Sequence, residues 1–417
     1  MFENTLTSAS KSIQTVISVL RTNDALRALL LRKGQDASGA QPEPSNHTGI
    51  DNTKCESDAV CNFPQELLAA APNKIDWQIF DHCASFTRIY AIFEQFVTDL
   101  ATAYIGELPV LYPTYSGLSE SVRTQHRVAV GQILQKWSSD GPYRHLTEQS
   151  IVKGLSDGLA AAPKYSLLAD AFLIDPHNYR PAAIRKIFGY LGFSDCWQGV
   201  QRHAAVTNYM AKIYGGSETA ESVLTAIVEF RNNASHSVVS DVASVDDICK
   251  YAEFLLTLCT ALCDIVHKGV IRRRIEAGMA PEIGVVVTRF GRASGVRLRS
   301  CELSIGDELY IRRGNSFRSV RVKSIRKVRE DREKVVVTSD EEFGVLLTHS
   351  PDEGYIVYKA PHLHSAFDNA IQADESLAED ASDEPDTNGP AADEDSSSAA
   401  DLPQGTSVNV DGVAGAS

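Results

Sequence analysis

The spacing of apolar residues changes once along this 417-residue chain, and the change separates two kinds of fold. Between Ile75 and Lys268, apolar side chains recur every three or four residues, as they do on the buried face of a helix. From Ile283 onward the period is two, which is typical of strands with one buried face. The sequence therefore predicts an α plus β multidomain protein, with an all-α domain at residues 75–269 and a small β-barrel at residues 280–360.

Two long helices frame the predicted all-α domain. The first contains "DHCASFTRIYAIFEQFVTDLATAYI", whose apolar positions form one broad stripe that is too regular for a strand. The second is expected to begin at Ser244, because a serine hydroxyl can accept hydrogen bonds from the free amides of a first turn. Asp246 and Asp247 favour the same end through the helix dipole. Gly269 is expected to end this helix.

Six short β-rich runs follow, separated by Gly, Asp and Asn turns at about the spacing of a small barrel. They are "IGVVVTRF", "DELYIRR", "FRSVRVKSI", "KVVVTS", "FGVLLT" and "GYIVYKA". Residues 272–334 hold seventeen Lys and Arg against eight acidic residues, although the net charge of the whole chain is -14. A basic barrel domain makes nucleic acid a plausible partner.

Both ends of the chain differ in composition from the middle. Residues 1–33 have a roughly helical apolar spacing, and residues 34–74 are polar and rich in Pro, Gly and Ser, as in a flexible linker. We therefore expect a tethered N-terminal helix, either a docking helix or a capping element. Residues 361–417 are predicted to be a disordered acidic tail. The tail is either a solubilising extension or an intramolecular mimic of RNA that covers the barrel.

Apolar runs and cysteine spacing bear on localisation and on metal binding. No apolar run approaches membrane-spanning length, and the N-terminus has no basic region followed by an apolar one, so a cytoplasmic protein without a membrane partner is expected. The eight cysteines show no CxxC pair and no Cys/His ligand spacing. No metal site, disulfide framework or cofactor is therefore predicted.

Side chains that can bind phosphate or transfer protons are concentrated in "EFRNNASHS", residues 229–237, directly after a strongly apolar helical pattern. Chance alone gives about 0.7 Arg/His pairs at this spacing in a chain of this composition, so the spacing decides nothing by itself. Residues five apart on a regular helix point about 140° away from each other, and asparagines readily end a helix. We therefore expect a helix that ends near Phe230, with Arg231 and His236 displayed around its distorted end.

The stretch "RNNASH" is similar to the signature of the HEPN superfamily, the higher eukaryote and prokaryote nucleotide-binding domain. The phrases "KIDWQIFDHCASFTRIYAIFEQFV", "YRHLTEQSIVKGL" and "LADAFLIDPHNYRPAAIRKIFGYLGF" resemble the upstream helices of bacterial HEPN nucleases of the RiboL-PSP type. The resemblance covers roughly residues 75–268. It implies a metal-independent endoribonuclease, often a toxin or phage-defence effector, that cuts RNA as a homodimer through the all-α domain. A cognate antitoxin or a defence partner protein is a further expectation.

The resemblance also implies roles for individual residues. His236 could take the proton from a ribose 2′-hydroxyl or donate one to the leaving 5′-oxygen, because its usual pKa is near neutral. Arg231 carries a permanent charge suited to the phosphate in the transition state. Asn232 could orient either group. Glu229 and Glu94 are supporting candidates for holding Arg231 or the His236 tautomer, although a solvated helix position is the simpler explanation of each.

A non-catalytic reading of the same residues stays open. The motif could form a polar helix end in a HEPN module that only binds nucleotides or a protein. Asn178 and Arg180, in "PHNYRP", also resemble the family, and a turn before a proline-initiated helix accounts for them as well.

The barrel segments "CELSIGDELYIRRG", "SVRVKSIRKV" and "EEFGVLLTH" resemble the second, β-barrel domain of translational GTPases. No "GxxxxGK[ST]" phosphate-binding motif occurs in the chain, which argues against a GTPase. The barrel is expected either to dock RNA or the ribosome, or to be a generic barrel with a charged solvent face. The candidate RNA-binding residues are Arg312, Arg313, Arg318, Arg321, Lys323, Arg326 and Lys327.

Overall fold

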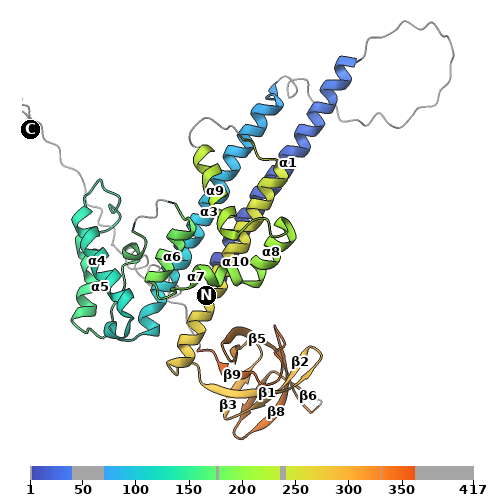
Figure 1. Ribbon diagram of the computed structural model, residues 1–417. Helices are drawn as coiled ribbons and strands as arrows, with labels where there is room; N and C mark the ends of the chain where they lie inside the picture. The colour runs from blue at the N-terminus through green and yellow to red at the C-terminus, as the bar shows by residue number, and fades with distance from the viewer. Residues whose placement is uncertain (1, 40–69, 175–177, 235–240, 329, 362–417) are drawn as a thin grey trace, which may run out of the picture. The chain divides into compact units, whose positions relative to one another are not determined.

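The computed structural model describes residues 2–39, 70–174, 178–234, 241–328 and 330–361 (Figure 1). These residues belong to one compact unit, Met1–Pro361. The predicted acidic tail, residues 361–417, lies outside the described residues apart from Pro361. Most of the predicted linker, at residues 40–69, also lies outside them.

The described part of the chain begins with nine α-helices and two short 3-10 helices. The α-helices are α1 (Glu3–Gly39), α3 (Lys74–Leu111), α4 (Glu120–Lys136), α5 (Glu148–Leu159), α6 (Pro181–Tyr190), α7 (Cys196–Arg202), α8 (Ala204–Tyr214), α9 (Ala220–Ala234) and α10 (Val245–Glu276). The 3-10 helices are η1 (Tyr115–Gly117) and η2 (Ala169–Phe172).

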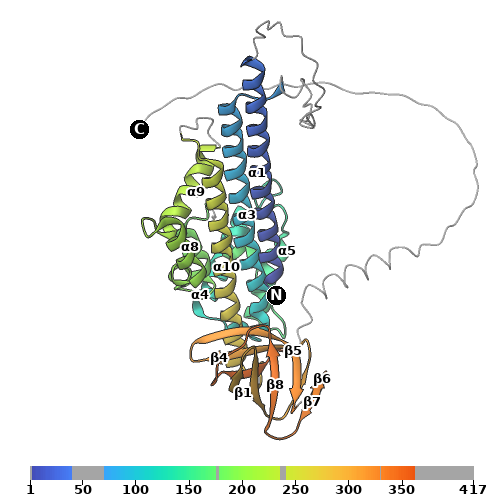
Figure 2. The same cartoon turned by 90° about the vertical axis from the view of Figure 1, so that its right-hand side faces the viewer.

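Three long helices, α1, α3 and α10, pack against one another, and Figure 2 shows them side by side. The predicted apolar stripe of α3 is buried, including Phe86, Ile89 and Phe93. Helix α9 packs on α3, and α8 packs on α10. The helical region thus has one continuous hydrophobic core, which confirms the expected all-α domain.

Helix α1 belongs to this core, which agrees with the docking alternative for the N-terminal helix. Its apolar residues Phe2, Ile13 and Leu20 are buried in the same cluster as α3 and α10. Arg27 of α1 forms a buried ion pair with Asp81 of α3 at 3.0 Å. The helix also extends to Gly39, six residues into the predicted linker. An apolar face that is continuous with the core makes α1 an integral helix.

Gly269 does not end the last helix, which corrects the sequence-based prediction. Helix α10 continues through Gly269 to Glu276. A Cβ atom at this position would lie 2.5 Å from Cε1 of Phe193. The glycine is therefore required for close packing, and it does not act as a stop signal.

Helix α10 also corrects the expectation that no segment approaches membrane-spanning length. Among the described residues, it is the one helix long and apolar enough to cross a membrane by length and composition. More than half of its most apolar segment is buried inside the protein, and Leu255, Leu258 and Leu262 are inaccessible to solvent. Its apolar character is accounted for by its central position in the helical core.

The C-terminal region folds as a closed barrel of six strands. Their order is β4-β9-β1-β2-β8-β5, and antiparallel pairing of β4 with β5 closes the barrel. Strand β6 extends from β5, and β3 pairs separately with β7. The strands are β1 (Glu282–Phe290), β2 (Ala293–Leu298), β3 (Cys301–Ser304), β4 (Glu308–Arg313), β5 (Ser316–Lys327), β6 (Glu330–Arg332), β7 (Lys334–Val337), β8 (Glu341–Leu347) and β9 (Ile356–Lys359).

Three of these strands, β2, β3 and β6, are absent from the sequence-based prediction. Strand β2 contains Ser294 and Gly295, which break the apolar alternation. A Cβ atom at Gly295 would overlap the Thr288 hydroxyl of β1, so this strand needs a glycine for close approach to β1.

A small separate hydrophobic core joins the end of α10 to the barrel, where Ile271 packs with Tyr310, Phe317 and Tyr358.

Candidate active site

The helix that carries Arg231 is longer than the sequence predicts. Helix α9 continues past Phe230 to Ala234, so Arg231, Asn232 and Asn233 lie in its last turn. Phe230 stacks on Phe86 of α3, with ring centroids 4.7 Å apart. This aromatic packing supplies tertiary stabilisation that outweighs the weak helix propensity of the two asparagines.

Three elements surround the guanidinium group of Arg231. One of its terminal nitrogens donates to the side-chain oxygen of Asn232 at 3.1 Å and to that of Asn178 at 3.5 Å. Its carbon Cζ lies 5.3 Å from the centroid of the Tyr90 ring on α3. The half-buried arginine is thus held between the end of α9, the segment before α6, and the middle of α3.

Tyr90 and Glu94 form the α3 wall of this site. The buried hydroxyl of Tyr90 accepts a hydrogen bond from the Tyr179 amide at 2.6 Å. Burial raises the pKa of Tyr90, and the Glu94 carboxyl raises it further. Burial also raises the pKa of Glu94, against the opposing effects of the Tyr90 hydroxyl and the Arg231 charge. A partly desolvated carboxyl group therefore lies within electrostatic reach of Arg231.

The other residues named in the sequence analysis do not all lie close to Arg231. Glu229 is exposed on α9, and no contact within the described residues ties it to the Arg231 group. Arg180 is exposed and precedes Pro181, the first residue of α6, as the turn interpretation predicts. Asn178, whose role the sequence left open, contacts Arg231 directly. Glu94 lies within electrostatic reach of Arg231, and its supporting role stays a prediction.

His236 lies outside the described residues, as do all of residues 235–240. The chain is described again from Asp241, and Ser244 then caps α10 by accepting from the Asp247 amide at 3.2 Å. The predicted start of the last long helix is confirmed. The acid-base role of His236 stays a prediction.

Sequence reasoning missed His82, which holds the chain just after this segment. Its Nδ1 accepts a hydrogen bond from the Ala243 amide at 3.0 Å, so the proton of the neutral ring is on Nε2. The ring is buried between Phe86 and Phe230. Burial lowers the pKa of His82, against the opposing charge of Asp241. The only signal in the sequence is its position four residues before Phe86 on the apolar stripe.

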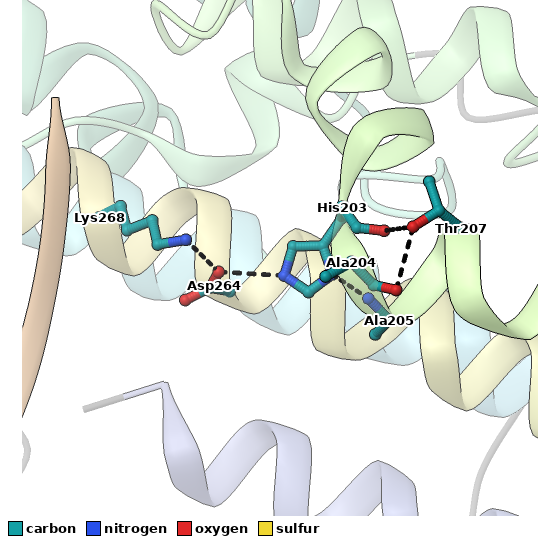
Figure 3. Close-up of polar contacts among 6 residues, drawn as sticks. All are labelled: His203, Ala204, Ala205, Thr207, Asp264 and Lys268. Atoms are coloured by element: carbon teal, nitrogen blue, oxygen red, sulfur yellow. Dashed lines mark hydrogen bonds and ion pairs between the residues drawn. The ribbon is translucent and has the colours of Figure 1, made fainter. Parts of the chain in front are cut away.

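A polar cluster of His203, Asp264 and Lys268 links the start of α8 to α10 (Figure 3). His203 caps α8 by accepting from the Ala205 amide at 3.3 Å, and its Nε2 contacts Asp264 at 3.0 Å. Lys268 contacts the same carboxylate at 2.6 Å. Burial acts to raise the pKa of Asp264, but Lys268 and His203 outweigh it, and the pKa is lowered. Both nitrogens of His203 are engaged, so this cluster ties α8 to α10.

The predicted RNA-binding side chains of the barrel divide into three groups. Arg326 and Lys327 form ion pairs with Asp331 and Glu341, at 2.7 Å and 2.6 Å. Arg312 and Arg313 lie near the aromatic rings of Phe317 and Tyr355. Exposed side chains on β5 without a described ion pair make up the third group, Arg318, Arg321 and Lys323. Ion pairing thus offsets part of the basic charge that the sequence shows.

Among the described residues, no group of three or more His, Cys, Asp or Glu side chains is placed to hold a metal ion. The charged groups at the Arg231 site include, within the described part of the chain, the guanidinium itself and the carboxyl of Glu94. They can position a phosphate group and a hydrogen-bonded partner, and a histidine is required from elsewhere for proton transfer.

The helical region has a polar Arg-Asn end on α9, directly before its last helix, α10. The family model described as HEPN_MAE_28990-like HEPN matches residues 8–275. The chain belongs to this family. The match includes α1, in agreement with its place in the helical core. No curated protein matches the chain.

The family match confirms the HEPN part of the sequence-based resemblance and no finer grouping. The RiboL-PSP assignment stays a prediction. The barrel is confirmed as a closed six-stranded barrel, and its resemblance to domain 2 of translational GTPases also stays a prediction.

Proposed function

We propose that this protein is a metal-independent endoribonuclease of the HEPN type. The observation that carries the proposal is the arrangement of Arg231, which Asn178, Asn232 and Tyr90 surround at the end of α9. The segment with His236 follows directly in the sequence. Membership of a HEPN family supports the same function, because HEPN domains are often ribonucleases.

In the proposed mechanism, the nucleophile comes from the substrate. His236 accepts the proton of a ribose 2′-hydroxyl, and the 2′-oxygen attacks the adjacent phosphorus. The bond between phosphorus and the 5′-oxygen breaks, and a protonated histidine gives that oxygen its proton. The products are a 2′,3′-cyclic phosphate and a 5′-hydroxyl. Arg231 stabilises the charge on the phosphate oxygens as it grows.

The surrounding residues position these groups. Asn178 and Asn232 restrict the rotation of the Arg231 guanidinium, and Glu94 provides a nearby opposite charge. Tyr90 connects Glu94 to the backbone of Tyr179 and so to the segment before α6. Glu229 is exposed and has no part in this arrangement, which makes it the control position.

We also propose that the enzyme works as a homodimer through its helical region. One chain supplies one acid-base histidine, and the two proton transfers are easier when two motifs face one cleft. Sedimentation of the full chain at micromolar concentration is expected to show a dimer. Mixed dimers with one His236→Ala subunit are expected to retain less than half of the activity. A fully active monomer would contradict the dimer.

The barrel is proposed to hold RNA through phosphate contacts, and the acidic tail to compete with it. Removal of residues 366–417 is then expected to tighten RNA binding and to steepen its fall with salt. A cytoplasmic toxin or phage-defence effector with an antitoxin or defence partner is the biological setting that fits such an activity. Identical RNA affinity and salt dependence without the tail would leave it a passive extension.

The decisive experiment is an RNA cleavage assay with excess EDTA. Wild-type protein and Glu229→Gln are expected to cut RNA and to leave 2′,3′-cyclic phosphate ends. His236→Ala is expected to lose roughly two to four decades of rate. Activity that collapses on chelation and returns with a divalent ion would defeat the mechanism.

A non-catalytic HEPN module is the second candidate. The contacts of Arg231 with Asn178 and Tyr90 support it, because an arginine with a purely structural role would make the same contacts. Such a module binds nucleotides or a protein and cuts no RNA. Folded protein that binds RNA without cleaving any of a broad set of substrates would support this candidate.

A further inference from the structure

The helical region has a pocket that the proposed active site does not use. It lies between the segment around η1, the first half of α4 and the end of α5, and its volume is about 370 Å³. Pockets that bind small molecules begin at roughly 300 Å³, so a ligand of mononucleotide size fits. The lining residues that matter here are Thr114, Tyr115, Ser116, Arg123, Thr124 and Arg127.

Two arginines of α4 give the pocket its charge. Arg123 and Arg127 are four residues apart, so they lie on the same face of the helix. Neither forms an ion pair within the described part of the chain. The Nε of Arg123 is buried and has no hydrogen-bond partner among the described residues. Two adjacent positive charges, one of them partly desolvated, favour a bound anion.

The other walls of the pocket are compatible with an anion. The carbonyl groups at the end of α5 would repel one, but backbone amides already occupy them: Ala160 and Ala162 donate to Ser156 and Asp157. The hydroxyl groups of Thr114 and Thr124 supply further donors, while that of Ser116 donates to Thr114. The ring of Tyr115, packed against Gly158, provides an apolar floor.

Glu120 lines the same pocket and limits where an anion can lie. It precedes Arg123 by three residues at the start of α4, so it lies one turn of the helix from Arg123 and about two turns from Arg127. A phosphate next to Glu120 would be repelled, whereas a sugar hydroxyl there can donate to the carboxylate. The pocket thus pairs a site for a phosphate with a site for a hydroxyl-bearing group.

We propose that this pocket binds the terminal phosphate of a nucleotide, with oxygens that accept from Arg123 and Arg127. A phosphomonoester carries about 1.5 to 2 negative charges at neutral pH, which matches two arginines better than the single charge of an internal phosphodiester. The sugar then contacts Glu120, and the base lies against Tyr115 and against Leu159, an exposed apolar residue that also lines the pocket. A free mononucleotide and the 5′ end of an RNA share this chemistry.

Calorimetric titration of the full-length protein tests the proposal and needs no catalytic activity, so its outcome is separate from that of the cleavage assay. The probes are adenosine 5′-monophosphate, adenosine, and a 2′-O-methyl pentanucleotide with either a 5′-phosphate or a 5′-hydroxyl. We expect adenosine 5′-monophosphate to bind, and adenosine to bind at least tenfold more weakly. A free nucleotide is the ligand if the phosphorylated pentanucleotide fails to bind, and an RNA end is admitted if it binds better than its hydroxyl form.

Two variants and one control locate the binding. Arg123→Gln with Arg127→Gln is expected to weaken nucleotide binding tenfold or more, because each arginine contributes a hydrogen bond to a charged group. Thr124→Trp is expected to block binding by filling the pocket while both arginines remain. Arg144→Gln, an exposed arginine outside the pocket, is expected to bind as the wild type does. Failure of every phosphorylated probe to bind the wild type, or equal affinity in the double variant, overturns the proposal.

Discussion

Arg274 of α10 and Glu107 of α3 form an ion pair at 2.7 Å, and their side chains are only 6% and 7% exposed. The same guanidinium donates to the hydroxyl of Tyr310 on β4 at 2.6 Å. One buried side chain therefore connects two helices of the helical region with a strand of the barrel. Burial of both charges is costly unless they remain paired.

Replacement of one partner of this pair is expected to destabilise the protein strongly. Glu107→Ala leaves Arg274 buried and unpaired, and breaking a buried pair costs about 3–5 kcal/mol. The double variant Glu107→Leu with Arg274→Met should cost less than Glu107→Ala alone. Urea unfolding measures both. The exposed pair Lys153 and Asp157 is the control, where Asp157→Ala should cost less than about 1 kcal/mol. Equal losses at both pairs would contradict the expected role of burial.

Acid is expected to destabilise the protein through His126. This buried imidazole accepts from the Leu168 amide, and burial lowers its pKa to about 4 from an ordinary value of 6.5. The unfolded chain binds the proton first, so stability is complete above about pH 6.5 and is lost as the pH falls toward 4. The loss amounts to about 3 kcal/mol. His126→Gln should flatten the pH dependence of the unfolding free energy over this window, and an unchanged slope would rule out His126 as its source.

His82 is expected to hold the chain that returns from the His236 segment. His82→Leu keeps an apolar side chain but removes the acceptor for the Ala243 amide, at a cost of about 1–3 kcal/mol. Hydrogen exchange at residues 241–244 should become faster, and mass spectrometry can measure it without any enzymatic assay. His82→Asn, whose side-chain oxygen can replace Nδ1, should restore part of the protection. Unchanged exchange in His82→Leu would show that the bond does not restrain this segment.

Two glycines in helices are expected to respond in opposite directions to alanine. Gly269→Ala brings a methyl group against Phe193 and should destabilise by about 1–3 kcal/mol. At Gly131 of α4 an added Cβ would meet no atom within 4 Å, so Gly131→Ala should stabilise by about 1 kcal/mol. Thermal unfolding of the two variants provides the comparison. Stabilisation by both would mean that Phe193 moves aside.

On the barrel, the side chains of β5 without a described ion pair are expected to dominate any RNA binding. Neutralisation of Arg318, Arg321 and Lys323 to Gln should weaken binding to unrelated RNAs and reduce the salt slope by roughly 3. The matched control is Arg326→Gln with Lys327→Gln, because these two are already paired with Asp331 and Glu341. Fluorescence anisotropy over a range of salt concentrations measures both sets. A larger effect of the control set would show that Arg326 and Lys327 contribute more to RNA binding than the β5 side chains without a described ion pair.

Periodicity predicts the fold best where one physical cause dominates. The stripe of α3 is set by a single buried face and is confirmed. The alternation of β5 is interrupted, because Val320, Val322 and Ile325 lie in the barrel core whereas Phe317 packs with Ile271 of α10. Glycine is harder to interpret from sequence. At Gly269 and Gly295 its function is close approach to Phe193 and Thr288, which are distant in the sequence or on another strand. A local pattern contains no information about such neighbours.

The candidate site is only partly visible in the sequence for the same reason. Arg231 and Glu94 carry charges that draw attention, and the structure brings them near one another. His82 acts on Ala243 across 161 positions, and Asn178 reaches Arg231 across 53. Their roles depend on which helices pack together, and this is decided by the whole core.

The packing of α1 against α10 has a consequence for the order of events during synthesis. Leu20 is buried in the same core as Leu262, so α1 cannot complete its contacts until more than two hundred further residues have been added. At typical rates of translation this takes roughly 10 to 50 s. During that interval the apolar face of α1 is without its final partner. The helical region, and any activity that depends on it, is therefore completed only late in the life of the nascent chain.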